Sequence, residues 1–466
     1  METQANQAPR GNPLGEKPIG KLLLQFAIPS IISTLVVALY NMVDQIFIGH
    51  RIGYLGNAAT TVAFPLTYIN GALTLLFSNG SAVNFNILCG KGNKEEALCF
   101  AGNGLSLLSV EGLCLASAVG IFTPLFVRVF GSTEEVFPYA LTYMRIIAVG
   151  LPFLALTSGG TLLVRSDGSP RYALWCSMTG VALNFVLDWL FLFPLGMGIA
   201  GAAWATVIGQ IVSALMLVWY LRRFKTGRLE RRHFKVSWER TKRICAIGAA
   251  ASFNQAAMVV MNTVRNNVLR KYGALSVYGA SEALAASGVV HKVNHLFYST
   301  IVGCGVGASP IMSFNFGAKK YARVLEAYRL VLRYALIVGA LETAVFWLFP
   351  DTILRLFGSG AVGYRDFAVR FMHEFMLLVI IAGIPTISMH VMTAVGKAKR
   401  GILISLSKQF ALIALMLLLP TFLGINGVLW AGPAADVLAA VASFLVLRPE
   451  FRALREMAER LEPGQG

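Results

Sequence analysis

Two aspartates stand inside stretches of sequence that are otherwise almost entirely apolar. Asp44 lies in the stretch 39–49, and Asp188 lies in the stretch 182–193. A charged aspartate at the centre of a bilayer costs at least about 2.5–3.5 kcal/mol, so it is expected to face a partner or a wet cavity. We therefore predict a functional role for both aspartates. The alternative is that each one caps a helix end or bonds to a kinked backbone.

Asn184 and Thr206 add oxygen atoms to the surroundings of Asp188. Asn184 precedes Asp188 by four residues, which places both on one helical face, about one turn apart. Oxygen-rich sites suit Na⁺, and neighbouring carboxyl groups can instead share a proton. The predicted cation-coupling site, which takes H⁺ or Na⁺ and needs no cofactor, consists of Asp44, Asn184, Asp188 and Thr206. The candidates for lining a substrate cleft are Tyr40, Asn41 and Glu282.

The composition places these residues in a membrane protein. The chain has 466 residues, of which 56% are hydrophobic and only 14% are charged, whereas a soluble domain averages about 25% charged residues. The formal net charge is +17, and ten of the basic residues lie between positions 222 and 243. No aromatic platform accompanies this basic stretch, so we expect the bilayer and not nucleic acid as the partner.

Twelve apolar segments are long enough to span a bilayer, which takes about 20 residues. They run near 22–49, 57–88, 97–125, 136–163, 172–194, 199–221, 243–271, 280–312, 326–350, 366–392, 403–423 and 427–447. Lys and Arg are richer in the loops that follow even-numbered segments and in the C-terminal tail. The positive-inside rule therefore predicts that both termini and the central loop are cytoplasmic.

The two halves of the chain resemble each other. Gly198-Ile-Ala-Gly-Ala-Ala-Trp-Ala matches Gly424-Ile-Asn-Gly-Val-Leu-Trp-Ala at an offset of 226 residues, Gly168 pairs with Gly396 at 228, and Gly53 pairs with Gly273 at 220. Nearly equal offsets predict a duplicated six-helix unit, with chance Gly and Ala matching as the alternative. We predict an all-α integral membrane fold with two pseudo-symmetric lobes, an N-lobe over residues 1–232 and a C-lobe over residues 233–466.

The lobes differ in their acidic residues. At these offsets the C-lobe carries Val264 and Met416 where the N-lobe carries Asp44 and Asp188. Lys408 and Asp436 fall on the last two segments and are expected to pair. The remaining sequence shows no nucleophile elbow, Walker motif or zincin motif, so an enzyme is not expected. His291 and His295 share a helical face, but no third metal ligand accompanies them.

Several strings, taken together, resemble the multidrug and toxic compound extrusion (MATE) family. They are 40–49 (Tyr-Asn-Met-Val-Asp-Gln-Ile-Phe-Ile-Gly), 183–188 (Leu-Asn-Phe-Val-Leu-Asp), 198–206 and 315–323 (Asn-Phe-Gly-Ala-Lys-Lys-Tyr-Ala-Arg). The last string is similar to a signature of the bacterial MepA-like and DinF-like members. The resemblance implies V-shaped lobes in the bacterial inner membrane, a monomer, and export of amphipathic organic cations in exchange for Na⁺ or H⁺. It also implies that Asp44, Asn184, Asp188 and Thr206 bind the coupling cation.

Two other functions remain as alternatives. A flippase for a lipid-linked oligosaccharide belongs to the same broad superfamily, but it is expected to need a cleft rich in Arg for phosphate. The basic residues at bilayer depth are few here, namely Arg265, Lys292 and Lys408. A scaffold that transports nothing would tolerate neutral residues at Asp44 and Asp188, and acids within a membrane argue against it.

Overall fold

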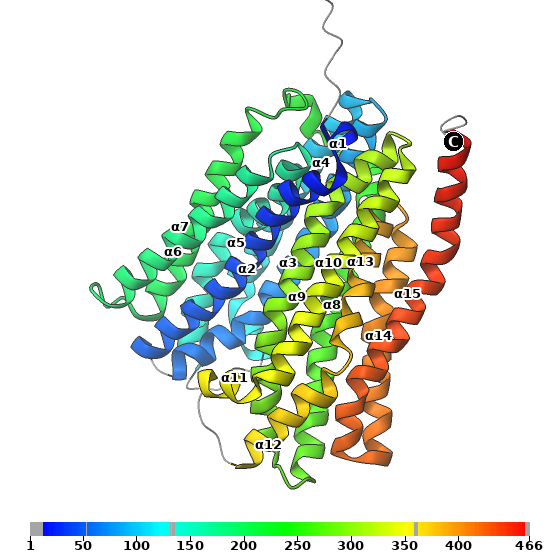
Figure 1. The fold of residues 1–466 in the computed structure, drawn as a ribbon. Coiled ribbons are helices and arrows are strands. Elements are labelled where there is room, and N and C mark those ends of the chain that lie inside the picture. The colour runs from blue at the N-terminus through cyan, green and yellow to red at the C-terminus, as the bar shows by residue number, and fades with distance from the viewer. Residues whose placement is uncertain (1–12, 53, 131, 133–135, 358–361, 462–466) are drawn as a thin grey trace, which may run out of the picture.

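The computed structural model describes residues 13–52, 54–130, 132, 136–357 and 362–461. These residues are almost wholly helical, with no strand among them (Figure 1). Lipid offers no hydrogen-bond partners to the backbone, so a spanning segment satisfies its own amides as a helix. The near-continuous apolar composition and the helical fold therefore have the same physical cause.

The first half of the chain runs from α1 to α7. Its helices are α1 (Pro13–Glu16), α2 (Ile19–Ile52), α3 (Tyr54–Gly90), α4 (Lys94–Val129), α5 (Phe137–Ser166), α6 (Pro170–Leu192) and α7 (Gly198–Leu221). A linker with the 3-10 turn η1 (Arg231–Phe234) leads to the second half. The lobe boundary at residue 232 stays a prediction, and it falls within η1.

The second half runs from α8 to α15. Its elements are α8 (Trp238–Ala274), α9 (Ala280–Gly317), α10 (Tyr321–Leu348), α11 (Pro350–Phe357), α12 (Val362–Arg370), the π-helix η2 (Phe371–Phe375), α13 (Val379–Ala394), α14 (Ala398–Leu423) and α15 (Ile425–Leu461). Figure 1 places α1, the linker and the C-terminal end of α15 at one end of the molecule. We call this end the terminal end and the opposite one the far end.

Eleven helices in the described part of the chain are long and apolar enough to span a membrane, and a bent pair brings the number to twelve. All twelve coincide with the segments predicted from the sequence. Two predictions need correction. The segment 366–392 is not one straight helix, because Tyr364–Phe375 and Val379–Ala394 meet at 55°. The last segment does not end near residue 447, because α15 continues to Leu461.

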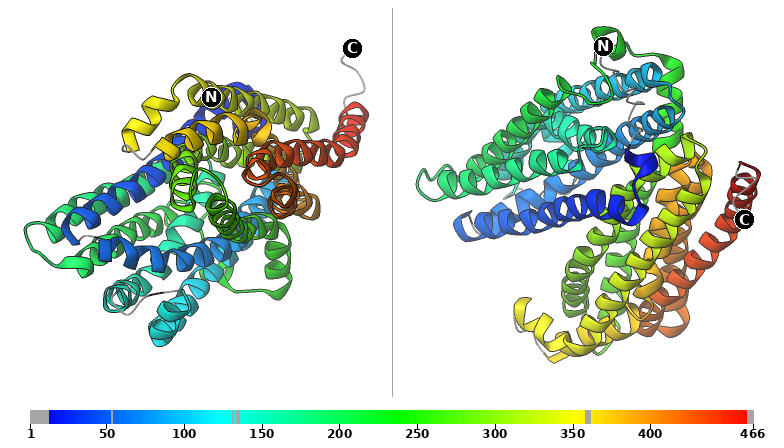
Figure 2. Two further views of the ribbon diagram at one scale, coloured as in Figure 1. Left: turned by 90° about the horizontal axis from the view of Figure 1, so that it is seen from below. Right: turned by 45° about the horizontal axis from the view of Figure 1, so that its top comes forward.

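Helix packing repeats between the halves. In the first half α2 packs against α6 and α6 against α7, and in the second half the equivalent helices α8, α14 and α15 pack in the same order. The halves meet where α2 packs against α9 and where α3 packs against α8. Because α2 is equivalent to α8 and α3 to α9, the repeat makes these two contacts equivalent. Figure 2 shows the two groups of helices splaying apart. The predicted pair of six-helix lobes is confirmed.

The repeated glycines share a backbone conformation. Gly168 and Gly396 have φ of 78° and 76°, and Gly198 and Gly424 have φ of 60° and 58°. Side chains rarely adopt this left-handed conformation, so glycine is the residue that turns the chain there at least cost. The sequence matches therefore mark equivalent turns. Gly53, the partner predicted for Gly273, lies outside the described residues.

Candidate functional site

Asp44 and Asp188 come together inside the N-lobe. Asp44 lies on α2 and Asp188 on α6, two helices that pack against each other. Their side chains are buried, with 8% and 1% of their surface exposed, and their carboxyl groups lie close enough to interact directly. Two buried carboxylates at such a separation repel each other, and a proton or another cation between them removes the repulsion. The geometry is therefore that of a carboxyl pair that can bind one positive charge.

Asn184 and Thr206 extend the pair toward α7. Asn184 lies one turn before Asp188 on α6 and is buried. Its amide nitrogen donates to the hydroxyl of Thr206 over 3.2 Å, and that hydroxyl donates to the carbonyl of Ala202 over 3.1 Å. The four residues predicted from the sequence thus lie on three helices that pack together. Their role in cation coupling stays a prediction.

Three oxygen atoms of this group are buried without a hydrogen-bond partner. They are Oδ1 of Asp44, Oδ1 of Asp188 and Oδ1 of Asn184. Buried polar atoms are nearly always paired, so three unpaired acceptors on neighbouring residues are an unusual concentration of oxygen atoms. Such oxygen atoms are the ligands that small hard cations prefer.

Apolar side chains separate the acids from the far end of these helices. One turn beyond each acid, the buried residues Ile48 and Leu192 pack with Ile199 and Ala202. The ring of Phe47 lies 5.3 Å from that of Phe185, with a second aromatic contact to Phe193. Excluding water in this way strengthens every electrostatic interaction of the acid pair.

The predicted cleft residues are not brought into this group. The side chains of Tyr40 and Asn41, on α2, lie outside the described part of the structure. Glu282 is half-buried in the first turn of α9, ahead of the candidate span Ala286–Gly317. The sequence analysis counted Glu282 among the apolar segments, and the structure places it before the spanning part of its helix. A cleft role for these three residues stays a prediction.

The C-lobe buries its charges elsewhere. Met416 and Val264, which stand at the positions equivalent to Asp188 and Asp44, pack in an apolar cluster, and Met416 is only 1% exposed. The predicted Lys408–Asp436 pair is present, with 2.8 Å between Nζ and Oδ1. Sequence reasoning missed that Glu342 on α10 accepts a 2.7 Å hydrogen bond from Asn294 on α9. Only the packing of α9 against α10 reveals that contact.

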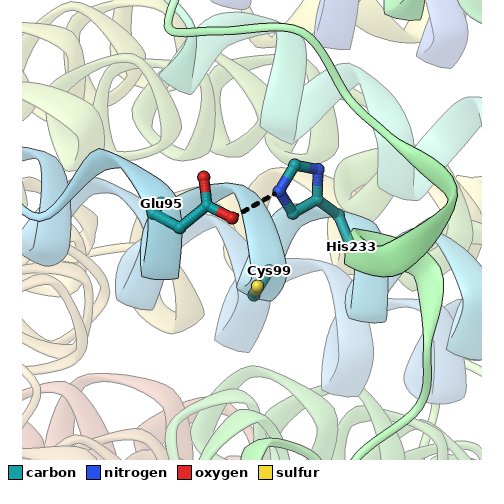
Figure 3. Close-up of side chains that lie close together, drawn as sticks. All are labelled: Glu95, Cys99 and His233. Atoms are coloured by element: carbon teal, nitrogen blue, oxygen red, sulfur yellow. Dashed lines mark hydrogen bonds and ion pairs between the residues drawn. The ribbon is translucent and has the colours of Figure 1, made fainter.

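A second cluster lies at the terminal end, where the linker crosses α4. Glu95, Cys99 and His233 place their potential metal-ligating atoms within 4.8 Å of one another (Figure 3). However, Nδ1 of His233 accepts the backbone N–H of Glu230, so Nε2 carries the proton of the neutral ring and donates to Glu95 over 3.0 Å. A metal-bound histidine normally donates from its other ring nitrogen. The cluster therefore fits a hydrogen-bonded anchor for the linker better than a metal centre.

Asp167 anchors the start of the same linker. It lies in the turn between α5 and α6 and accepts hydrogen bonds from Tyr220, Lys225 and Thr226, at 2.6–2.8 Å. Burial raises the pKa of the Asp167 carboxyl, while these hydrogen bonds lower it and offset part of the rise. The linker is thus held to the N-lobe through Asp167, through Glu95 and through Ser106, whose hydroxyl donates to the carbonyl of Phe234 over 2.8 Å.

Known proteins resemble the chain along almost its full length. A probable multidrug resistance protein, YoeA, of Bacillus subtilis is 27% identical over 77% of both chains. A FAD transporter of Shewanella oneidensis is 26% identical over 92% of this chain and 94% of its own length. The multidrug export protein MepA of Staphylococcus haemolyticus is 22% identical over 96% of this chain and 97% of its own.

Solved structures share the fold. An outward-facing multidrug resistance MATE family transporter of the MOP superfamily has a TM-score of 0.87 at 21% identity, covering 97% of this chain and all of its own. A MOP superfamily transporter from Pyrococcus furiosus has a TM-score of 0.88 at 21% identity, covering 96% of this chain and 99% of its own. The sequence model of the MatE family matches residues 29–190 and 251–421, one stretch in each half and most of the chain together. The chain therefore belongs to the MatE family of multi-pass membrane transporters, as its motifs predicted, and is not an enzyme.

Proposed function

We propose that this chain is a secondary active exporter, which moves amphipathic organic cations out of the cell in exchange for H⁺ or Na⁺. The observation that carries the proposal is the buried Asp44–Asp188 pair with its unpaired oxygens. Acids at this depth are costly unless they bind something. The multidrug names of YoeA and MepA support the same substrate class.

Competition for the acid pair gives the coupling a physical basis. A proton shared by the pair would satisfy one oxygen of each carboxyl group, while Na⁺ would replace that proton and bind the three unpaired oxygens. Either cation neutralises charge that would otherwise be buried without compensation. A cation that binds or leaves therefore changes the free energy of the conformation in which the pair is buried.

Helix α2 connects the acid pair to the interface between the lobes. Asp44 lies toward the far end of α2, and the same helix packs against α9 of the C-lobe. At that contact the hydroxyl of Thr34 donates to the carbonyl of Ser299 over 2.9 Å. A rearrangement of α2 on cation binding would therefore act directly on the lobe interface, which is where a substrate-sized opening must form and close.

We further propose a monomer in the bacterial plasma membrane with both termini in the cytoplasm. The basic linker and the C-terminal end of α15 share the terminal end of the molecule (Figure 1). Basic residues concentrate on the cytoplasmic side of membrane proteins. Labelling of single cysteines introduced at either end, in intact and in opened cells, tests this orientation.

Flux measurements in proteoliposomes test the exchange. Proteoliposomes that contain the purified protein are loaded with ethidium as the organic cation. A Na⁺ gradient and a pH gradient are then imposed in separate experiments. We expect one of the two gradients to drive ethidium transport, and Asp188→Asn to abolish that response. Asp351→Asn, which changes an exposed residue paired with Arg365, is the matched control. Wild-type transport in Asp188→Asn would reject the coupling role.

A second candidate is export of a substrate that carries an anionic group. Arg265 on α8 is only 9% exposed, has no hydrogen bond or ion pair to the described residues, and has its Nε buried without a partner. The FAD transporter among the relatives moves a phosphate-bearing molecule, and a lipid-linked oligosaccharide also carries phosphate. If Arg265 binds such a group, Arg265→Gln will lose FAD transport and keep ethidium transport.

A further inference from the structure

A cluster of polar side chains joins four helices inside the C-lobe. Asn294 comes from α9, Glu342 from α10, Lys408 from α14 and Asp436 from α15, and all four helices are candidate spans. Asn294 donates to Glu342 over 2.7 Å, and Lys408 contacts Asp436 at 2.8 Å. The helices that carry the two pairs pack together, α10 against both α9 and α15, and α14 against α15. Glu342 lies within electrostatic range of both Lys408 and Asp436, so the two pairs form one cluster.

The cluster contains more acid than base. Lys408 supplies one positive charge, while Glu342 and Asp436 supply two carboxyl groups. Glu342 and Asp436 are 1% and 7% exposed, and an ionised carboxylate buried without compensation costs several kcal/mol. One ammonium neutralises one carboxylate, so the second carboxyl group is stable only with a proton or another cation. Glu342, which makes no ion pair within the described chain, is that second group.

Other titratable groups around the cluster do not change this count. Tyr298 and His291 of α9 lie within electrostatic range of Lys408, and His291 also lies within that range of Arg265 of α8. Neither adds a carboxyl group to the cluster. The remaining charged and histidine residues on elements that pack against α10 are Lys21, Asp44, His50, Arg51, Glu282, Lys292, His295, Asp351, Arg355, His373, Glu374, His390, Arg448, Glu450, Arg452, Arg455, Glu456, Glu459 and Arg460. None of them is among the groups that act on Glu342, whereas Lys408 and Asp436 are.

We propose that Glu342, Lys408 and Asp436 form a second ion-binding site that holds one exchangeable proton, with the Lys408 ammonium in the place of a free metal cation. The side chain of Lys408 is 26% exposed, so the cluster is not fully enclosed by protein. The site would make the C-lobe sensitive to protons and indifferent to Na⁺. The role of this site in coupled transport rests on the proposed exchange function. Proton binding at the site does not depend on that function.

Glu342→Gln is the variant that tests proton binding. Glutamine has the shape of the protonated glutamate and keeps an acceptor for Asn294, so we expect it to fold normally. Infrared difference spectra of the purified protein in the Asp44→Asn, Asp188→Asn background, titrated with alkali, should show a protonated carboxyl band that is lost when Glu342→Gln is added. The control Glu326→Gln changes an exposed residue on the same helix and should keep the band. A band unchanged in Glu342→Gln would overturn the proposal, whether or not the protein exports ethidium.

The same variant tests coupling. With ethidium and a pH-sensitive dye in proteoliposomes, Glu342→Gln should move one fewer proton per ethidium than the wild type and Glu326→Gln. An unchanged ratio with a lost infrared band would confine the site to proton binding and reject its coupling role. A wild type that responds to neither gradient would instead reject the proposed exchange function.

Lys408→Met tests whether the Lys408 ammonium occupies the position that a metal cation would otherwise take. In an Asp44→Asn, Asp188→Asn background, which removes the N-lobe acids, the added Lys408→Met leaves two C-lobe acids without a base. Na⁺ should then raise the unfolding temperature, whereas K⁺ should do so less and the background alone should not respond. Lack of any Na⁺ effect in a folded Lys408→Met protein would contradict the idea that Lys408 stands in for a cation. If this protein does not fold, the infrared result for Glu342→Gln decides.

Discussion

The N-lobe and the C-lobe share their helix packing but bury their charges in different ways. In the N-lobe, two acids on α2 and α6 face each other, and no basic side chain contacts them within the described chain. In the C-lobe, the equivalent positions are apolar, the buried acids lie on α10 and α15, and Lys408 forms an ion pair with Asp436. The N-lobe needs a bound cation to neutralise its buried acids. In the C-lobe, the side chain of Lys408 supplies most of the neutralising positive charge.

The difference indicates which properties a duplicated membrane unit keeps. Backbone turns and helix contacts are equivalent because each lobe must satisfy the same amides and pack the same surfaces. Each lobe also has a buried acid on the equivalent helix, but at a different position: Glu111 on α4 accepts from Thr74 on α3, and Glu342 on α10 accepts from Asn294 on α9. The full set of buried charges is free to diverge, because each lobe needs only to be neutral when closed.

Neutralising one acid should lower stability in the C-lobe and leave it unchanged in the N-lobe. Asp436→Asn leaves the Lys408 ammonium with Glu342 as its only acidic neighbour, and we expect a loss of up to about 3–5 kcal/mol, as for other broken buried ion pairs. Asp188→Asn leaves no base without a partner and relieves repulsion between two acids, so it should fold as well as the wild type. Thermal unfolding of both variants in one detergent measures the contrast.

The double variant Lys408→Met, Asp436→Leu serves as the control for that contrast. Replacing both members of a buried ion pair by apolar residues is often neutral or stabilising, so this protein should recover most of the stability lost in Asp436→Asn. If the double variant is as unstable as Asp436→Asn, the pair contributes through packing and not through charge. Equal losses in Asp188→Asn and Asp436→Asn would remove the distinction between the lobes.

The contact between the lobes offers a matched pair of positions where the effects should be alike. Near the terminal end, a Cβ on Gly90 of α3 would overlap the carbonyl oxygen of Phe314, and a Cβ on Gly317 of α9 would overlap that of Ile87. Crowding of this kind costs about 1–3 kcal/mol. Gly90→Ala and Gly317→Ala should therefore both weaken closure of this end, by similar amounts.

Distances between the lobes measure that closure. Spin labels at the exposed positions Lys94 in the N-lobe and Glu326 in the C-lobe should report a longer separation in both glycine variants. A change in only one variant would show that the two helices contribute unequally. Gly120→Ala, where an added Cβ meets nothing, should leave the distance unchanged.

The number and order of the helices could be predicted because each span must be apolar over a minimum length. What sequence patterns did not predict is local. The bend between Phe375 and Val379 follows a π-helix, which depends on backbone hydrogen bonding and not on residue type. The continuation of α15 past residue 447 occurs in a stretch with enough charge to leave the membrane, where apolar length no longer marks the end of a helix.

The N-lobe residues could be proposed because acids are costly at bilayer depth and because Asn184 lies one turn from Asp188. The partnership of Glu342 with Asn294, and of both with Lys408 and Asp436, could not be deduced, since it depends on which faces of four helices meet. The same holds for the Glu95–His233 contact, which joins residues 138 positions apart.

The smallest expected effect concerns two equivalent turns with different residues. Gly92 ends the α3 turn with φ of 81°, while Lys319, at an offset of 227, ends the α9 turn with φ of 60° as the only non-glycine with positive φ among the described residues. The left-handed conformation costs a residue with a side chain roughly 1–2 kcal/mol. Glycine avoids this cost, but it also raises the conformational entropy of the unfolded chain, which offsets part of the stabilisation.

Lys319→Gly should therefore stabilise the protein by about 0.5–1 kcal/mol, and Gly92→Ala should destabilise it by about 1 kcal/mol. A Cβ on Gly92 meets no neighbouring atom, so its cost comes from the backbone alone. Thermal unfolding of the two single variants and of their combination measures both effects. If the turns are equivalent, the two changes should nearly cancel in the combined variant. A stabilising Gly92→Ala would show that the turns differ in more than residue type.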